Sequence, residues 1–193
     1  LKKRLLHTKT TSAVVGISGG LDSTLALLVT AKAFDMARIP RANIHAVTMP
    51  CFGTTDRTYQ NACRMSEKLG ATLMEVPIRE AVTVHFRDIG QDLEDHSVTY
   101  ENGQARERTQ VLMDLANKSG GLVIGTGDMS ELALGWATYN GDHMSMYGVN
   151  ASVPKTLVRH LVQYYADTCR DRELREVLLD VLDAPVSPEL LPP

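Results

Sequence analysis

Few features of this chain point to cysteine-based structure or to a membrane. Its three cysteines, Cys51, Cys63 and Cys169, are odd in number, and no pair has the Cys-x-x-Cys spacing. This argues against a disulfide framework and against a zinc ribbon. No apolar run is long enough to span a membrane, and no signal peptide with a basic start and an apolar core is visible. We therefore expect a cytoplasmic protein with no membrane partner.

The chain also lacks a strong charge of either sign. Its 20 basic and 23 acidic residues give a formal net charge of −3, so we expect no nucleic-acid partner. A length of 193 residues suits one domain, which we place over the whole chain, 1–193. The first residue is Leu1 rather than Met and the last two are prolines, from which we expect a piece of a longer polypeptide.

Short apolar runs alternate with helical patterns along the chain. Apolar runs predict strands over 13–17, 43–49, 72–76 and 122–125. Helical periodicity predicts helices over 1–7, 23–37, 56–69, 79–89, 101–118, 155–169 and 171–182. The stretch 126–154 is rich in Gly, Asn, Asp, Ser and Met and predicts one long functional loop. The alternation predicts an α/β fold with a mostly parallel sheet and helices on both faces.

The segments that follow the predicted strands are the natural places for a ligand. In a parallel sheet of this kind, ligands bind beyond the carboxyl ends of the strands. Four segments fall there: 18–23, 49–55, 76–79 and 126–131. These four segments are therefore the candidates for the functional site.

The first of them is the glycine-rich loop Ser18-Gly19-Gly20-Leu21-Asp22-Ser23. Backbone N–H groups of a strand–helix loop, with the positive end of the helix dipole, form an anion site. The two glycines permit positive φ values and a close approach of the backbone, and the two serines add hydroxyl donors. The loop therefore predicts phosphate binding. The simpler alternative is a tight strand–helix turn with no ligand.

The loop differs from the two common nucleotide motifs. It has neither the lysine of G-x-x-x-x-G-K-[ST] nor the spacing of G-x-G-x-x-G. The carboxylate of Asp22 would repel a phosphate unless a cation lay between them, so we interpret Asp22 as a Mg²⁺ ligand. The pattern S-G-G-x-D-S resembles the pyrophosphate loop of the N-type ATP pyrophosphatases, which have an adenine-nucleotide alpha hydrolase-like fold. That resemblance implies an enzyme that adenylates a carbonyl or carboxyl oxygen and releases pyrophosphate.

Three later segments resemble NAD synthetase. They are Asn102-Gly103-Gln104-Ala105-Arg106-Glu107-Arg108, Gly125-Thr126-Gly127-Asp128-Met129-Ser130-Glu131, and the stretch 135–156 with its Val153-Pro154-Lys155-Thr156 end. The resemblance extends from about Leu5 to Leu190, and the sequence of residues 144–156 resembles the glutamine-dependent branch of the family. In that branch an N-terminal glutaminase domain supplies ammonia. The resemblance implies a homodimer or a higher homo-oligomer, and it implies that the glutaminase domain and a C-terminal tail lie outside these residues.

The implied reaction is the amidation of nicotinic acid adenine dinucleotide (deamido-NAD). Its nicotinate carboxylate attacks the α-phosphate of ATP, which gives an adenylate and pyrophosphate. Ammonia then displaces AMP and gives NAD. The enzyme implied is a ligase of NAD biosynthesis that forms a C–N bond and uses ATP and Mg²⁺.

The resemblance also assigns roles to individual residues. Asp22 and Glu131 match the Mg²⁺ carboxylates, and with Lys155 they form the catalytic set. ATP would contact Gly16, Ile17, Ser18, Gly19, Gly20, Leu21, Asp22, Ser23, Met49, Thr126, Lys155 and Ser187, the last at a position where relatives often carry Thr. The dinucleotide would contact Asn102, Arg106, Trp136 and Asp142.

Each assignment has a plainer alternative. Arg106 could belong to a solvated helix face, and Glu131 could be a first-turn acid favoured by the helix dipole. Trp136 could pack in the core, and Lys155 could simply begin a helix. For the whole chain, the alternatives are another N-type pyrophosphatase, GMP synthetase-like or tRNA-thiolating, or a non-catalytic ATP-binding module.

Overall fold

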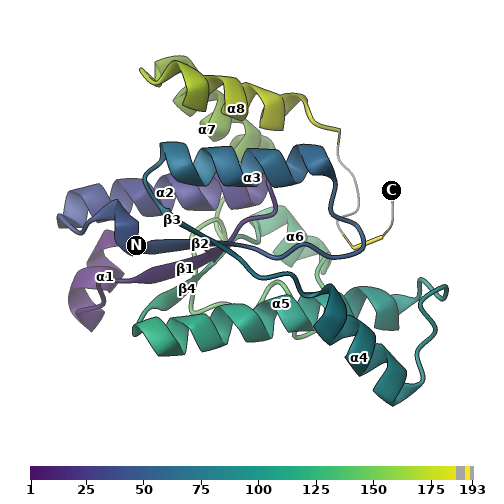
Figure 1. The fold of residues 1–193 in the computed structure, drawn as a ribbon. Helices are drawn as coiled ribbons and strands as arrows, with labels where there is room; N and C mark the ends of the chain where they lie inside the picture. The colour runs from purple at the N-terminus through teal and green to yellow at the C-terminus, as the bar shows by residue number, and fades with distance from the viewer. Residues whose placement is uncertain (186–189, 192–193) are drawn as a thin grey trace.

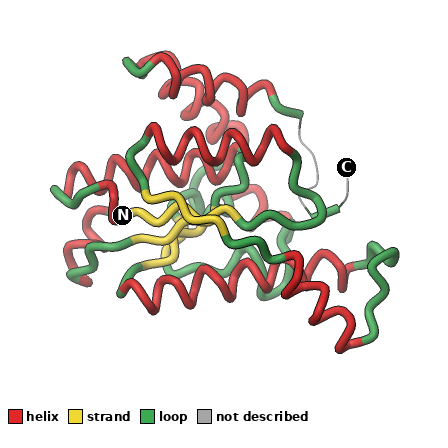
Figure 2. Tube along the Cα trace, in the orientation of Figure 1, coloured by secondary structure: helices red, strands yellow, loops and turns green. Residues whose placement is uncertain are grey.

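The computed structural model describes residues 1–185 and 190–191, which form a five-stranded sheet flanked by α-helices (Figures 1 and 2). In chain order the elements are α1 (Lys2–Thr8), β1 (Ala13–Gly16), α2 (Leu21–Ala37), the 3-10 turn η1 (Arg41–Asn43), β2 (Ile44–Thr48), α3 (Asp56–Lys68), β3 (Thr72–Glu75), α4 (Arg79–Ile89), α5 (Val98–Ser119), β4 (Leu122–Gly125), α6 (Met129–Leu134), β5 (Tyr147–Gly148), α7 (Lys155–Thr168) and α8 (Arg172–Asp183). None of the helices in this part of the chain is both long and apolar enough to cross a membrane.

The order of the strands decides where the site lies. The sheet runs β3-β2-β1-β4-β5, and all its pairings are parallel. The chain first builds outward from β1 through β2 to β3, then returns to the other side of β1 with β4. Connections that leave β1 and β4 therefore diverge to opposite sides, and ligands of such sheets bind at this switch point. The loops after β1 and β4 are thus the expected walls of a site.

Alternating side chains of the strands build two cores. Along β1, Ala13 and Val15 point to one face and Val14 to the other. α2 and α3 lie on the first face, with α7 and α8 packed on these helices, and α5 lies on the second face with α4 packed against it, as Figure 1 shows above and below the sheet. Because both faces are covered, β1 consists of small and β-branched apolar residues throughout. The predicted α/β fold with helices on both faces is confirmed.

The prediction of one long loop over 126–154 is wrong. This stretch contains α6, of six residues, and β5, of two residues. β5 pairs with β4 through Ile124 opposite Tyr147 and Gly125 opposite Gly148, so the sheet has a fifth strand that the sequence did not predict. Elements this short contain too few residues to show a hydrophobic period.

Two helices begin earlier than predicted. α2 begins at Leu21 instead of Ser23, because Gly20 takes an extended conformation (φ −86°, ψ 175°) and serves as the N-cap. Asp22 therefore lies in the first turn of α2, near the positive end of its dipole. α5 begins at Val98 instead of Glu101, after Ser97 as its N-cap.

Candidate functional site

The glycine-rich loop after β1 passes tightly against α3. Gly19 has φ +85°, and a Cβ added to it would overlap the backbone oxygen of Thr58. The conformation and the lack of space both require glycine here. Before the turn, the N–H of Ile17 donates to Val47 O at 2.8 Å, which continues the sheet pairing up to the loop.

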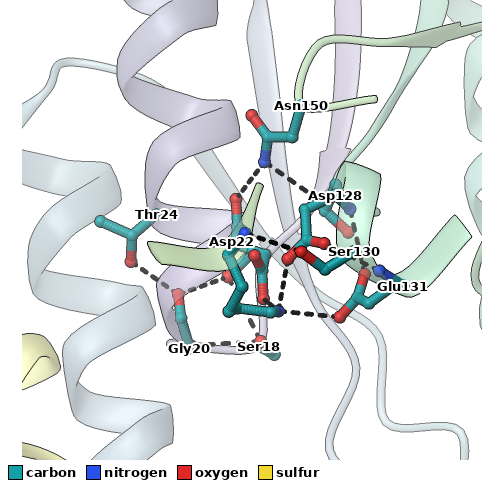
Figure 3. Close-up of polar contacts among 11 residues, drawn as sticks. Ser18, Gly20, Asp22, Thr24, Asp128, Ser130, Glu131 and Asn150 are labelled. Carbon is teal, nitrogen blue, oxygen red and sulfur yellow. Dashed lines mark hydrogen bonds and ion pairs between the residues drawn. The ribbon is translucent and has the colours of Figure 1, made fainter. Parts of the chain in front are cut away.

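The hydroxyl groups of the loop bond to the loop itself. The N–H of Gly20 donates to Ser18 Oγ at 3.2 Å, and Ser18 Oγ lies 3.2 Å from Ser23 Oγ. Ser23 Oγ and Thr24 Oγ1 both donate to Gly20 O, at 3.1 and 2.8 Å (Figure 3). These bonds hold the turn between β1 and α2 in one shape. Such order before binding lowers the entropic cost of seating a ligand.

The segment after β4 is organised by a reciprocal helix cap. Asp128 is the N-cap of α6, and its Oδ1 accepts a hydrogen bond from the N–H of Glu131 at 2.9 Å. Glu131 Oε2 in turn accepts from the N–H of Asp128 at 3.0 Å. This capping box satisfies two backbone donors of the helix start and fixes the Glu131 side chain beside the Asp128 carboxylate.

Lys155 joins the loops after β1 and β4. Its Nζ lies 2.5 Å from Asp22 Oδ2, 2.8 Å from Asp128 Oδ2 and 2.9 Å from Glu131 Oε1. One oxygen from each of the three carboxylates falls within 4.8 Å of the others. The structure therefore brings together the three residues expected to be catalytic, Asp22, Glu131 and Lys155, and adds Asp128.

Asn150 and Ser130 also connect the segments that carry the cluster. Asn150 is fully buried, and its Nδ2 donates to Asp22 O and to Thr126 O, both at 3.0 Å (Figure 3). The N–H of Lys155 donates to Ser130 Oγ at 3.1 Å, which ties the start of α7 to α6. The carboxyl ends of β1 and β4 are thus fixed relative to each other by side-chain to backbone bonds.

The cluster carries more negative than positive charge, since three carboxylates face one ammonium. Burial raises the pKa of Asp22 to about 6, against the opposing effect of Lys155. Burial alone would also raise the pKa of Asp128, but Lys155 and a hydrogen bond from the backbone of Glu131 lower it below its usual value. The pKa of Lys155 is raised, because its bonds to the carboxylates, Asp128 first, outweigh its burial. A further cation would relieve the excess negative charge.

The donor set fits a hard divalent cation. Carboxylate oxygens are the ligands that Mg²⁺ takes from proteins. Among the described residues, the buried Oδ1 of Asp22 has no hydrogen-bond partner, so this oxygen is available to a ligand. The side chains of Asp22 and Glu131 are 24% and 28% exposed, so an ion can reach both from solvent.

The residues expected to bind the dinucleotide gather around one exposed loop. Arg106 is an exposed residue of α5, and its Nε donates to Tyr139 O at 3.1 Å. Asn102 lies one turn earlier on the same helix. Asp142 accepts hydrogen bonds from the hydroxyl and the N–H of Thr138, and Trp136 is 79% exposed. Packing of Trp136 in the core is therefore wrong.

The remaining ATP assignments have varied surroundings. Met49, directly after β2, is buried, and its Cε would lie 3.5 Å from a Cβ built on Gly16. Thr126 follows β4 and is held by Asn150 through its backbone oxygen. Ser187 lies outside the described residues. Glu131 lies in the first turn of α6 and Lys155 begins α7, as the plainer alternatives proposed. Their side chains also meet in the cluster.

Residues 1–174 match the family model described as NAD synthase. The chain belongs to the NAD synthase family. It is 46% identical to a glutamine-dependent NAD(+) synthetase of Mycobacterium leprae, over 100% of this chain and 29% of that protein. It is 32% identical to the one of Synechocystis, over 93% of this chain and 31% of that protein. The chain thus spans less than a third of the length of these curated relatives.

Solved structures of the NAD synthase family have the same fold. A glutamine-dependent NAD+ synthetase of Acinetobacter baumannii, solved in complex with ADP, matches with a TM-score of 0.82 and 30% identity, over 92% of this chain and 33% of that one. An NH3-dependent NAD synthetase of Campylobacter jejuni matches with a TM-score of 0.73 over 94% of this chain and 88% of that one. Its 21% identity supports the fold alone. The predicted adenine-nucleotide alpha hydrolase-like class is confirmed.

Sequence reasoning missed Asp128, Ser130 and Asn150 as members of the site. Asp128 had a signal, because an aspartate followed three residues later by a glutamate is the pattern of a capping box. Asn150 had none, because its two bonds depend on how the chain runs after β5.

Proposed function

We propose that this chain catalyses the ATP-dependent amidation of deamido-NAD to NAD, with release of AMP and pyrophosphate. One observation carries the proposal: Asp22, Glu131 and Lys155, distant in sequence, converge beyond β1 and β4 at the switch point of the sheet. Family membership supports the reaction class, and the ADP complex of the A. baumannii relative supports an adenine nucleotide as ligand.

The chain would act by positioning and by neutralising charge. Backbone N–H groups of the loop 18–23, at the start of α2, would hold the ATP phosphates. The Lys155 ammonium would lie beside them and stabilise negative charge that develops as the α–β phosphate bond breaks. The nicotinate carboxylate, held in line with the α-phosphate, would form the new P–O bond as pyrophosphate leaves.

Mg²⁺ would be held by Asp22 and Glu131, the two carboxylates of the cluster that solvent reaches. Bound there, it would shield phosphate oxygens and the departing pyrophosphate. Asp22 must be ionised to bind it, so the raised pKa of this residue predicts weaker binding below about pH 6.

The dinucleotide would lie along α5 and the loop after α6. Arg106 supplies a fixed cation for its phosphates, and the exposed ring of Trp136 offers a stacking surface. Asn102 and Asp142 are proposed as hydrogen-bonding groups for the same substrate.

We further propose that ammonia comes from a glutaminase domain of a longer protein, as the names of the curated relatives suggest. A cytoplasmic homodimer fits a biosynthetic enzyme of this family. The exposed apolar residues Leu132, Leu134, Trp136 and Tyr139 support a protein interface on α6 and the following loop. The molar mass in solution, measured by light scattering, tests the dimer.

The proposal is tested by pyrophosphate release with deamido-NAD and ammonium as substrates. Asp22→Asn and Glu131→Gln should each lower kcat by about 10²–10³, the loss typical of removing one group that stabilises transition-state charge. Asp35→Asn is the control and should keep the parent rate. Asp35 lies in the last turn of α2, at the opposite end from Asp22, and forms an exposed ion pair with Arg41.

Three outcomes would contradict the proposal. Parent rates in both site variants would remove Asp22 and Glu131 from the chemistry. Pyrophosphate release with a GMP synthetase-type or tRNA acceptor, and none with deamido-NAD, would favour another N-type pyrophosphatase. ATP binding with no release on any acceptor would favour a binding module.

A further inference from the structure

Asp128 differs from the other two carboxylates of the cluster in its burial. Its side chain has 0% exposure, against 24% for Asp22 and 28% for Glu131. An ion that arrives from solvent can therefore reach Asp22 and Glu131, whereas the surroundings of Asp128 close it off. The three carboxylates are unequal in what they can bind.

Asp128 nevertheless has a partner at each of its oxygens. Oδ1 accepts from the N–H of Glu131 at 2.9 Å, and the buried Oδ2, which accepts no hydrogen bond from the described residues, forms an ion pair with Lys155 Nζ at 2.8 Å. This residue therefore holds two members of the catalytic set at once. A buried carboxylate is stable in its charged form when a fixed cation and backbone donors face it, as they do here.

We propose that Asp128 is a positioning residue, which keeps the Lys155 ammonium at the site while Asp22 and Glu131 bind the metal. The inference rests on the proposed function, because it takes Asp22 and Glu131 as the Mg²⁺ ligands. It assigns each carboxylate a separate task. The buried one holds the lysine, and the two exposed ones hold the ion.

The physical reason is competition for the same oxygens. In the structure Lys155 Nζ contacts Asp22 and Glu131 as well as Asp128. A divalent ion on Asp22 and Glu131 repels the ammonium and takes over both of these contacts. Asp128, whose buried Oδ2 already faces Lys155, then remains as the anion for this ammonium. Without the charge of Asp128, Lys155 would stay on Asp22 and Glu131 and weaken metal binding.

Asp128→Asn separates the charge of this residue from its capping role. Asparagine caps helices as well as aspartate does, so its side-chain oxygen can still accept from the N–H of Glu131 and α6 remains capped. The substitution removes the negative charge that faces Lys155. Asp128→Ser, which also retains a capping oxygen, is a second variant of the same kind.

The measurement is the affinity for ATP by calorimetry, first in excess Mg²⁺ and then in EDTA. The ratio of the two dissociation constants gives the gain in affinity that Mg²⁺ provides. Asp128→Asn should reduce this gain about tenfold, as loss of a partner that orients a metal-site group typically does. In the Lys155→Met background, Asp128→Asn should change the gain in ATP affinity from Mg²⁺ less than about twofold, because no ammonium is left to compete with the ion.

Other patterns overturn the inference. An equal loss in both backgrounds would mean that Asp128 binds the metal directly or acts only through the fold. No loss in the parent background would mean that Lys155 does not need Asp128. Thermal unfolding of each variant checks that α6 and its surroundings remain folded. Failure of the proposed function would show separately, as a lack of pyrophosphate release with deamido-NAD in the parent chain.

Discussion

Gly19 sets the path of the glycine-rich loop 18–23 by its lack of a side chain. Its φ of +85° lies in the left-handed region, and the backbone of Thr58 on α3 fills the space where a Cβ would be. The conformation alone would favour glycine, but the contact with α3 makes the requirement stricter. The loop can therefore lie close to α3.

Gly19→Ala should accordingly be far more damaging than an alanine at another left-handed glycine. Gly90, the C-cap of α4, has φ +73° and nothing within 4 Å of its added Cβ, so it is the matched control. We expect Gly90→Ala to lower the free energy of unfolding by about 1 kcal/mol. Gly19→Ala should lower it by about 3 kcal/mol or more, because strain and overlap add. Equal losses in urea unfolding would show that the contact with Thr58 is unimportant.

The sequence could place Asp22 and Glu131 at one edge of the sheet but could not predict their partners. The carboxyl ends of parallel strands share an edge, so residues that follow β1 and β4 must come near each other. The contacts of Lys155 and Asn150 depend on the chain between α6 and α7, which has no regular period. The resemblance assigned a role to Lys155, whereas Asn150 was only one residue of the matching segment 144–156 and had no role assigned.

At the scale of elements, a polar cluster of Arg57, Asn61 and Asp180 links α8 to α3. Asp180 on α8 accepts from Arg57 Nη2 at 2.7 Å and from Asn61 Nδ2 at 2.6 Å, both on α3. Asn61 is 4% exposed, so its amide has little access to water. These bonds stabilise the ionised carboxylate and hold the pKa of Asp180 below its usual range, with Arg57 as the larger cause.

The lowered pKa of Asp180 gives a pH-dependent contribution to stability. The folded protein binds fewer protons at this residue than the unfolded chain, so the contribution is present above the unfolded pKa of about 3.9 and is lost as the pH falls through the folded value. Asp180→Asn should lower the free energy of unfolding by about 1 kcal/mol at pH 7, a figure reduced for solvent screening. The difference from the parent should shrink below about pH 4.

Urea unfolding at several pH values checks this, with Asp114→Asn on the exposed side of α5 as the control. The control should match the parent throughout. A difference for Asp180→Asn that stays constant from pH 7 to pH 3 would show that the ionised carboxylate is not what links α8 to α3.

Short elements were the weakest part of the prediction from sequence. Strands β1, β2, β3 and β4 were located to within a residue or two, because their apolar runs stand between turn signals. α6 and β5 were missed because six and two residues are too few for a period to appear. Their positions depend on contacts with β4 and α7, which are tertiary.

At the scale of the whole molecule, the site is a product of the strand order. β1 lies at the centre of the sheet, with β2 on one side and β4 on the other, so the loops after β1 and β4 meet at the edge where the chain changes direction. The second half of the chain then supplies Asn150 and Lys155, which cross-link those loops. The alternation of predicted strands and helices was enough to predict the fold class. The meeting of these loops with Lys155 and Asn150 depends on the complete strand order and could not be predicted from that alternation.

The proposed reaction requires that the nicotinate carboxylate accept the adenylyl group of ATP, and oxygen transfer tests this step most directly. Deamido-NAD labelled with ¹⁸O on both carboxylate oxygens is incubated with ATP, Mg²⁺ and ammonium. The masses of the AMP, pyrophosphate and NAD formed are then measured by mass spectrometry. The account predicts one ¹⁸O in each AMP and one retained in the amide of each NAD, with unlabelled pyrophosphate. Unlabelled AMP, or label in pyrophosphate, would contradict adenylation of the carboxylate at this site.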